Sequence, residues 1–168
     1  MPTGLKQSSS VVSIGFTASE AAPGALAESQ IDLNLSPLDR EVFVVLAVNL
    51  DTSTPEMVAG TDTQVKAGLT TTSQATMPQL SDSNCLARVT STIRNDGALA
   101  AAFQTGALET PPATLEYIGI IATNDFFVQV QSTGQASNGS MTGKMYGYRA
   151  VANADIFAAL VQSEVLSA

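Results

Sequence analysis

Two carboxylates flank a polar loop in this 168-residue sequence, where they could contribute to a cation site. Asp51 ends the hydrophobic run at residues 41–51, and Asp62 closes the Ser/Thr-rich segment that follows it. Ca²⁺ takes about six to eight oxygen ligands, which loop carboxylates and backbone carbonyls can supply. Asp is also a common turn residue at strand ends, and this second interpretation is favoured. We therefore expect no metal site, and name Asp51 and Asp62 as the positions where Ca²⁺ would bind if it bound at all.

The residue types that carry most enzyme chemistry are missing or isolated. The chain has no His, which excludes Ser–His–Asp and Cys–His catalysis and imidazole ligation of zinc, copper or iron. Its single cysteine, Cys85, can form neither an intrachain disulfide nor a thiolate cage, and we expect it to be a small buried hydrophobe. We therefore predict no catalytic residues, no cofactor and no small-molecule substrate, and interpret the protein as a non-enzyme.

Acidic residues outnumber basic residues by 15 to 7, which gives a formal net charge of −8. The Lys and Arg residues are scattered, with no basic run and no basic arm. Binding to phosphates needs clustered cations, so we expect no direct nucleic-acid binding. The longest apolar run, residues 42–48, is far shorter than the roughly 20 residues of a membrane span. We also expect no signal peptide, because the apolar stretch after the N-terminus is too short.

Alternation of apolar and polar residues with a period of two dominates the sequence, and Gly, Pro, Asn, Asp and Ser interrupt it. This pattern predicts eight strands, at residues 10–16, 30–36, 41–51, 63–72, 84–94, 115–123, 126–132 and 142–151. The sixth and seventh of these are expected to form a hairpin around Asn124-Asp125, a pair that tolerates left-handed turn angles.

Two segments have apolar residues at helical spacing instead. Residues 97–104 predict a short helix, which Gly106 and the following prolines would end. Residues 153–166 predict a C-terminal helix, with Asn153 as the N-cap and an apolar stripe along one side.

Strands that are separated by loops and do not alternate with helices indicate an all-β protein. We predict a two-sheet antiparallel sandwich, an eight-stranded jelly roll with a short C-terminal helix. An immunoglobulin-like sandwich is the next alternative, although its Cys…Trp…Cys core is missing. One domain is expected over residues 1–168, with residues 1–9 as an N-terminal tail. Residues 41–51 are apolar on both faces, so we expect a central strand covered on both sides. In a shell protein, a neighbouring subunit could cover its second face.

Only 13% of the residues are charged, against roughly 25% in an ordinary globular domain. A monomer with so few charges would have a poorly protected surface, whereas contacts between subunits would cover it in an assembly. We therefore predict a homo-oligomer. Tyr and Arg are favoured at interfaces, which makes Tyr146, Tyr148 and Arg149 interface candidates, together with Phe157 of the predicted helix. The same residues could equally form the edge of the core.

The succession of short strands in a Thr- and Ser-rich, His-free chain resembles single jelly-roll capsid proteins of viruses. The resemblance is carried by residues 41–51, 117–130 and 146–166, covers most of the chain in architecture, and includes no family motif. It implies a self-assembling subunit of an icosahedral or tubular virion shell, located in the virion after assembly in the host cytoplasm. Its partners would be copies of itself and other virion proteins. Many small capsid proteins have a basic arm, which this chain lacks. We therefore expect no direct binding to the genome, and the layer beneath the shell could be a membrane.

Two other function classes fit the same sequence. An extracellular appendage or adhesion subunit would have an exposed edge or would donate a terminal strand such as residues 10–16 to a neighbour. A small carbohydrate-binding or hydrolytic sandwich would need a concave aromatic cleft with clustered acids, and only 5% of the residues are aromatic.

Overall fold

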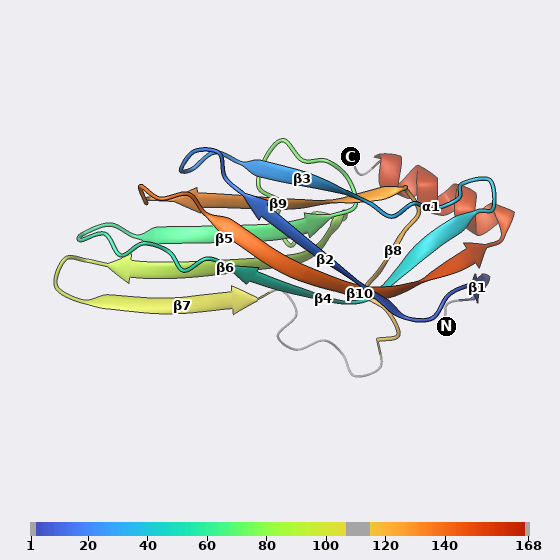
Figure 1. Cartoon of the computed structure of the whole chain (residues 1–168), viewed down its shortest axis with the longest axis horizontal. Coiled ribbons are helices and arrows are strands. Elements are labelled where there is room, and N and C mark those ends of the chain that lie inside the picture. Colours follow the sequence, from blue (N-terminus) through green and yellow to red (C-terminus); the bar gives the residue numbers. More distant parts are fainter. Residues whose placement is uncertain (1–2, 107–114, 167–168) are drawn as a thin grey trace.

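Two antiparallel sheets and one helix make up the computed structural model, which describes residues 3–106 and 115–166 (Figure 1). The first sheet contains β1, β2, β4, β8 and β10, and the second contains β3, β5, β6, β7 and β9. The elements are β1 (Leu5–Gln7), β2 (Val12–Ser19), β3 (Ala27–Asp32), β4 (Glu41–Thr52), β5 (Thr63–Thr70), β6 (Cys85–Asn95), β7 (Ala100–Gly106), β8 (Gly119–Ile121), β9 (Asp125–Thr133), β10 (Ser140–Ala152) and α1 (Ala154–Leu166).

The strand pairing is that of a jelly roll. Four antiparallel pairs are nested along the chain, namely β2 with β10, β3 with β9, β4 with β8, and β5 with β6. Rolling such a nested set places β2-β10-β4-β8 in one sheet and β3-β9-β5-β6 in the other. The predicted eight-stranded sandwich is therefore confirmed, and β1 and β7 are additions at its edges.

The main core lies between the two sheets. Alternate residues of β5 and β9 face inward, so that Val65, Leu69 and Val128 are fully buried. The rings of Phe16 and Phe126 meet edge to face across the core, with centroids 5.6 Å apart and planes at 76°. Apolar burial of this kind is the largest favourable contribution to folding, and the period-two pattern of the sequence produces it directly.

The second face of β4 is covered by helix α1 of the same chain. Val42 and Val44 are fully buried in a second cluster, to which the helix contributes Ile156, Phe157 and Leu160. A neighbouring subunit is therefore not needed to cover this part of the strand. No helix in the described ranges is long and apolar enough to cross a membrane.

Helix α1 begins where the sequence predicts. The side-chain oxygen of Asn153 accepts a hydrogen bond from the Ile156 N–H at 2.9 Å, which is the N-cap geometry. The Asn153 N–H donates to the carbonyl of Gly4 at 3.2 Å and so links the helix start to the beginning of the chain. Leu5, in the segment expected to be a tail, is buried, and β1 pairs there with β10.

The short helix expected over residues 97–104 is wrong. Ala100 to Gly106 form the strand β7, which pairs with β6 in unbroken register from Asn95↔Ala100 to Val89↔Gly106. Ala has a high helix propensity, but the unpaired edge of β6 offers backbone hydrogen bonds over seven positions. Here the tertiary pairing overrides the local preference of the sequence.

The predicted hairpin around Asn124-Asp125 is also wrong, because its two arms lie in different sheets. β8 pairs with Phe43–Val45 of β4, whereas β9 pairs with β3 and β5. Asn124 lies at the crossing between the sheets. Its carbonyl accepts the Leu33 N–H at 2.7 Å and its side-chain oxygen accepts the Leu35 N–H at 2.6 Å. Through these two bonds Asn124 holds the β3–β4 connection in place, and it does not form the tight turn of a hairpin.

Glu164 fastens helix α1 to this crossing. Its buried carboxylate accepts the N–H groups of Ala122 at 3.0 Å and Thr123 at 2.8 Å. Burial raises the pKa of the Glu164 carboxyl, and the charge of Asp125 adds to the rise, while the donors from Ala122 and Thr123 oppose it. The net direction is upward, so the folded protein binds this proton more tightly than the unfolded chain does.

This shift predicts a specific pH dependence of stability. An acid whose pKa is raised by folding loses its stabilising contribution as the pH rises from the ordinary value of 4.5 through the raised value. In Glu164→Gln this titration is absent, so the free energy of unfolding of the wild type relative to that of Glu164→Gln should fall as the pH rises above 4.5. Urea titrations at several pH values measure both slopes, and parallel curves for the two proteins would contradict the assignment.

Candidate functional site

The four interface candidates lie around the junction of β10 and α1, and two of them serve the core of their own chain. Tyr148 is only 7% exposed and lies in the same buried cluster as Val42 and Val44, against which Phe157 packs. Tyr146 is half-buried on the same face of β10, opposite Ala47 of β4. The role of these residues in an interface stays a prediction.

Arg149 holds the β3–β4 connection against β10. Its guanidinium donates to the carbonyls of Leu33 at 2.8 Å and Asn34 at 3.0 Å, and forms an ion pair with Glu41 at 3.2 Å. Asn34 has a positive φ of 50°, a conformation that Asn tolerates better than most residues. The guanidinium thus supplies hydrogen-bond donors to two carbonyl groups of the β3–β4 connection, which take no part in strand pairing.

The two calcium candidates have separate surroundings. Asp62 accepts the Asn95 N–H at 3.1 Å and lies 3.8 Å from the Arg94 side chain, so it joins the ends of β5 and β6. Asp51 is exposed near the end of β4, beside a different depression. Within residues 3–106 and 115–166, no group of three His, Cys, Asp or Glu side chains is arranged to hold a metal ion.

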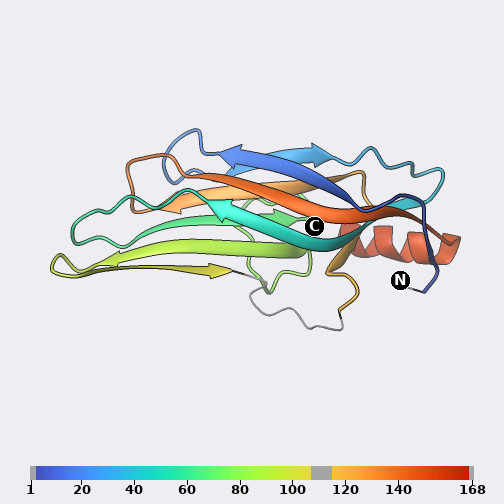
Figure 2. The same ribbon diagram turned by 60° about the horizontal axis from the view of Figure 1, so that its bottom comes forward.

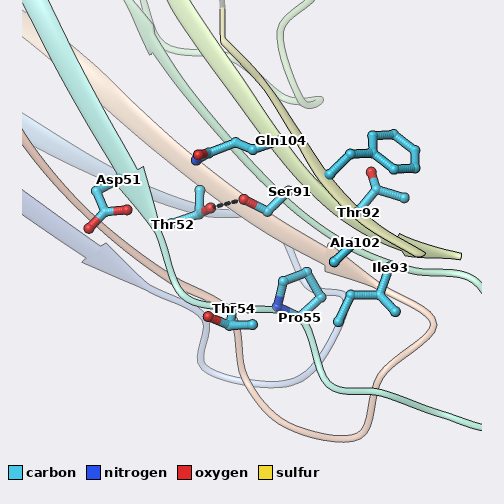
Figure 3. A pocket seen from close by; sticks show the side chains of 10 residues that line it. Asp51, Thr52, Thr54, Pro55, Ser91, Thr92, Ile93, Ala102 and Gln104 are labelled. Carbon is cyan, nitrogen blue, oxygen red and sulfur yellow. Dashed lines mark hydrogen bonds between the residues drawn. The ribbon is translucent and has the colours of Figure 1, made fainter. Parts of the chain in front are cut away.

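A depression of about 340 Å³ lies between the end of β4 and the inward face of the β6–β7 pair (Figure 3). Thr52 and Ser91 form a 2.7 Å hydrogen bond across it, and Gln104 of β7 and Pro55 of the β4–β5 connection lie at its sides. Among the described residues that line it, Asp51 is the only ionisable one. Hydroxyl and amide groups predominate, and these described lining residues include no nucleophile with an adjacent base.

Among the described residues, the strand β7 forms one edge of the second sheet and pairs on one side only, with β6. Figures 1 and 2 show it outside β6, with the β6–β7 hairpin extending past the end of β4. Six of its seven residues are exposed, including Phe103 at 49%. Register with β6 places Ala102 and Gln104 on the inward face, and Phe103 and Thr105 on the outward face.

A second depression, of about 370 Å³, lies on the outward face beside this strand. Phe103 and Thr105 of β7 line it together with Leu80, which is 57% exposed, and Arg88 of β6. This surface could not be predicted as long as residues 97–104 were expected to form a helix. The available signal was the absence of any charged residue between Asp96 and Glu109.

Other large apolar side chains are exposed outside the core that lies between the two sheets. Leu38, in the turn before β4, is 96% exposed, and Leu99, before β7, is 78% exposed. The remaining members of this set are Val11, Val12, Met57, Leu115, Val165 and Leu166. They lie at loops, strand ends and the end of α1, around the periphery of the sandwich.

Comparisons with known proteins complete the description. No protein-family model and no curated protein matches the chain. A chain of Desmodium yellow mottle tymovirus is 16% identical, with a TM-score of 0.37, over 92% of this chain and 95% of that chain. A chain of the empty head of turnip yellow mosaic virus is 12% identical, with a TM-score of 0.34, over 91% of this chain and 88% of that chain. Both TM-scores are low, so these similarities establish neither a family nor a function.

Proposed function

We propose that this protein is a non-enzymatic structural subunit that assembles with copies of itself into the shell of a virus particle. The observation that carries the proposal is the exposure of large apolar side chains around a jelly roll with few charges. Leu38, Leu99 and Phe103 face solvent in a chain of which 13% is charged. Exposed apolar groups of this kind mark interaction surfaces, which contacts between subunits would cover.

The jelly-roll fold is compatible with several function classes. Jelly rolls occur in viral capsid proteins, lectins and cupins. Metal chemistry through imidazole has no ligand here, since the chain has no His, and sugar stacking on indole is unavailable without Trp. The depression beside Asp51 has a polar lining, with Phe103 as its aromatic member, which gives little support to carbohydrate binding. A shell subunit needs no such site.

The charge distribution indicates what such a shell would contact on its inside. Seven scattered cations in a chain of net charge −8 give no patch for phosphates. We therefore propose no direct contact with the genome, and other virion proteins or a membrane as the inner neighbour. The location would be the virion, after assembly in the host cytoplasm, in an icosahedral or tubular layer.

The appendage alternative gains no support from the N-terminal strand. Val12–Ser19 pair with β10 of the same chain over eight positions, from Gly147↔Val12 to Ser140↔Ser19. A strand donated to a neighbour would leave this position in its own sheet to another chain. The first sheet instead contains its own β2.

The proposal predicts that the purified protein assembles. Light scattering coupled to size-exclusion chromatography, with negative-stain imaging of the same fractions, should show closed particles, tubes or sheets in equilibrium with small oligomers. Raising the protein concentration should increase the assembled fraction, because association follows mass action. A monomer at every concentration tested, or a monomer that binds a small ligand tightly, would contradict the proposal.

A further inference from the structure

We propose that β7 is a docking edge for a second copy of this chain, and that two copies join by antiparallel β7–β7 pairing about a twofold axis at Phe103. The inference rests on the proposed function in one respect, that the partner is the same protein. It adds the surface through which a pair of subunits meets, and the register of that contact.

The strand β7 has none of the features that protect edge strands. Charged side chains, Pro and bulges are the usual means of blocking edge-to-edge pairing. No charged residue or Pro occurs between Asp96 and Glu109, and the ladder from β6 to β7 has no bulge. The opposite edge of the same sheet, β3, contains Glu28 and Asp32. Within residues 3–106 and 115–166, β7 is therefore the less protected of the two edges of the second sheet.

The edge of the first sheet that β2 forms is placed differently. β2 pairs with β10 on one side and lies against β3 and β9 of the second sheet. Its Phe16 and Ala18 are buried in the main core. This strand closes a corner of the sandwich, whereas β7 extends past the end of β4 with both of its faces exposed (Figure 2).

The lack of charge on β7 favours a second copy of this chain as the partner. Two copies that each have a net charge of −8 repel one another, and the repulsion is smallest where the meeting surfaces have no acidic residue. The seven residues of β7 have no charge at all. An antiparallel strand edge is also self-complementary, because a twofold axis brings N–H groups of each strand opposite C=O groups of the other copy. A second copy therefore satisfies both conditions.

The side chains of β7 are compatible with pairing of the strand with its own copy. A twofold axis at Phe103 places that residue opposite its own copy, Ala102 opposite Gln104, and Ala101 opposite Thr105. Directly opposite residues have Cβ atoms roughly 4.5–5.5 Å apart, within reach of an aromatic pair. Phe103 is 49% exposed, so its ring is accessible to the ring of a second copy. Backbone bonds would supply affinity, and the facing rings would set the register.

Cysteine cross-linking tests this register. Cys85 is the only cysteine, so Cys85→Ser gives a background in which a single new thiol can be placed. Phe103→Cys in that background should form a disulfide-linked dimer under mild oxidation, because each thiol faces its own copy. Ala101→Cys is the matched control on the same face of the same strand, where each thiol would face Thr105 instead. We expect at least a tenfold higher yield of dimer from Phe103→Cys.

A lysine on the strand gives an independent measurement that keeps Phe103 in place. Ala101→Lys should raise the protein concentration needed for association at least tenfold, as charged residues do on natural edge strands. Ala158→Lys makes the same change at an exposed position of α1 and should leave association unchanged. Circular dichroism of each variant checks that the fold is retained.

The outcomes separate the two proposals. Particles in the wild type, with equal cross-linking at positions 101 and 103 or with unimpaired association of Ala101→Lys, would overturn the β7 contact alone. A specific dimer through position 103 in a protein that forms no larger particles would support the β7 contact and overturn the shell function. A protein that stays monomeric in every experiment would overturn both.

Discussion

Replacing Phe126 by alanine should lower the free energy of unfolding by about 3–5 kcal/mol, the range measured for truncating buried aromatic residues. Phe126 is fully buried at the start of β9 and meets the ring of Phe16 across the main core. The substitution removes the ring from the packed interior and leaves a cavity that the two sheets can close only in part. Urea unfolding followed by far-UV circular dichroism measures this loss of free energy, at protein concentrations where the protein is monomeric.

Phe103→Ala provides the matched control. The residue type and the substitution are the same, but Phe103 is 49% exposed on the edge strand β7. We expect a change of less than about 1 kcal/mol, as for most surface substitutions. Equal destabilisation by the two substitutions would show that β7 is packed more closely than the structure indicates.

Gly147→Ala should be the second severely destabilising change, with a loss of about 3 kcal/mol or more. Gly147 lies in β10, paired with Val45 just after the register shift between the two strands. A Cβ atom there would run into the carbonyl oxygen of Val44 and the ring of Phe43. The carbonyl belongs to the neighbouring strand, so the clash can be relieved only by moving the backbone of the sheet.

Gly15→Ala tests whether this effect comes from crowding. Gly15 lies in β2 of the same sheet, paired with Lys144, and a Cβ atom at that position meets no other atom within 4 Å. Alanine there should stabilise the protein by about 0.4–1 kcal/mol, because it restricts the unfolded chain. Thermal unfolding of both variants separates the two effects, and a loss of stability in Gly15→Ala would contradict the crowding argument.

The strands of the roll could be predicted from the sequence because their side chains alternate between a core and a polar surface. The eight predicted segments correspond to β2–β6 and β8–β10, and Asn153 caps α1 as expected. The apolar pattern of residues 41–51 also correctly indicated a strand covered on both faces, at Val42 and Val44 by the helix of the same chain. Period and capping are local signals, and here the tertiary structure agrees with them.

The pairing of strands could not be predicted in the same way. Asn124-Asp125 is compatible with a tight turn, and only the contacts of Asn124 with Leu33 and Leu35 show that it connects the two sheets. The alternation in β4 is interrupted as well, because Leu46 is left unpaired between Val45↔Gly147 and Ala47↔Tyr146. Val48 and Leu50 therefore join the main core instead of continuing the face of Val44.

The candidate surface was the least predictable part. The segment Ala100–Phe103 has a helical preference, and an edge strand with exposed faces has no buried side that would impose alternation. Tyr148 has the composition of an interface residue and is buried beneath α1. Composition therefore predicts association without a location for it, and the topology was needed to find the edge strand β7.

The central position of β10 has a consequence for synthesis of the chain. This last strand pairs with β1, β2 and β4, so the first sheet has no framework until β10 has left the ribosome. The second sheet can begin earlier, since β5, β6 and β7 pair in sequence order. Such long-range pairing makes folding slow. A prematurely terminated chain that lacks β10 cannot close the roll, because β1, β2 and β4 then lose the strand with which they pair.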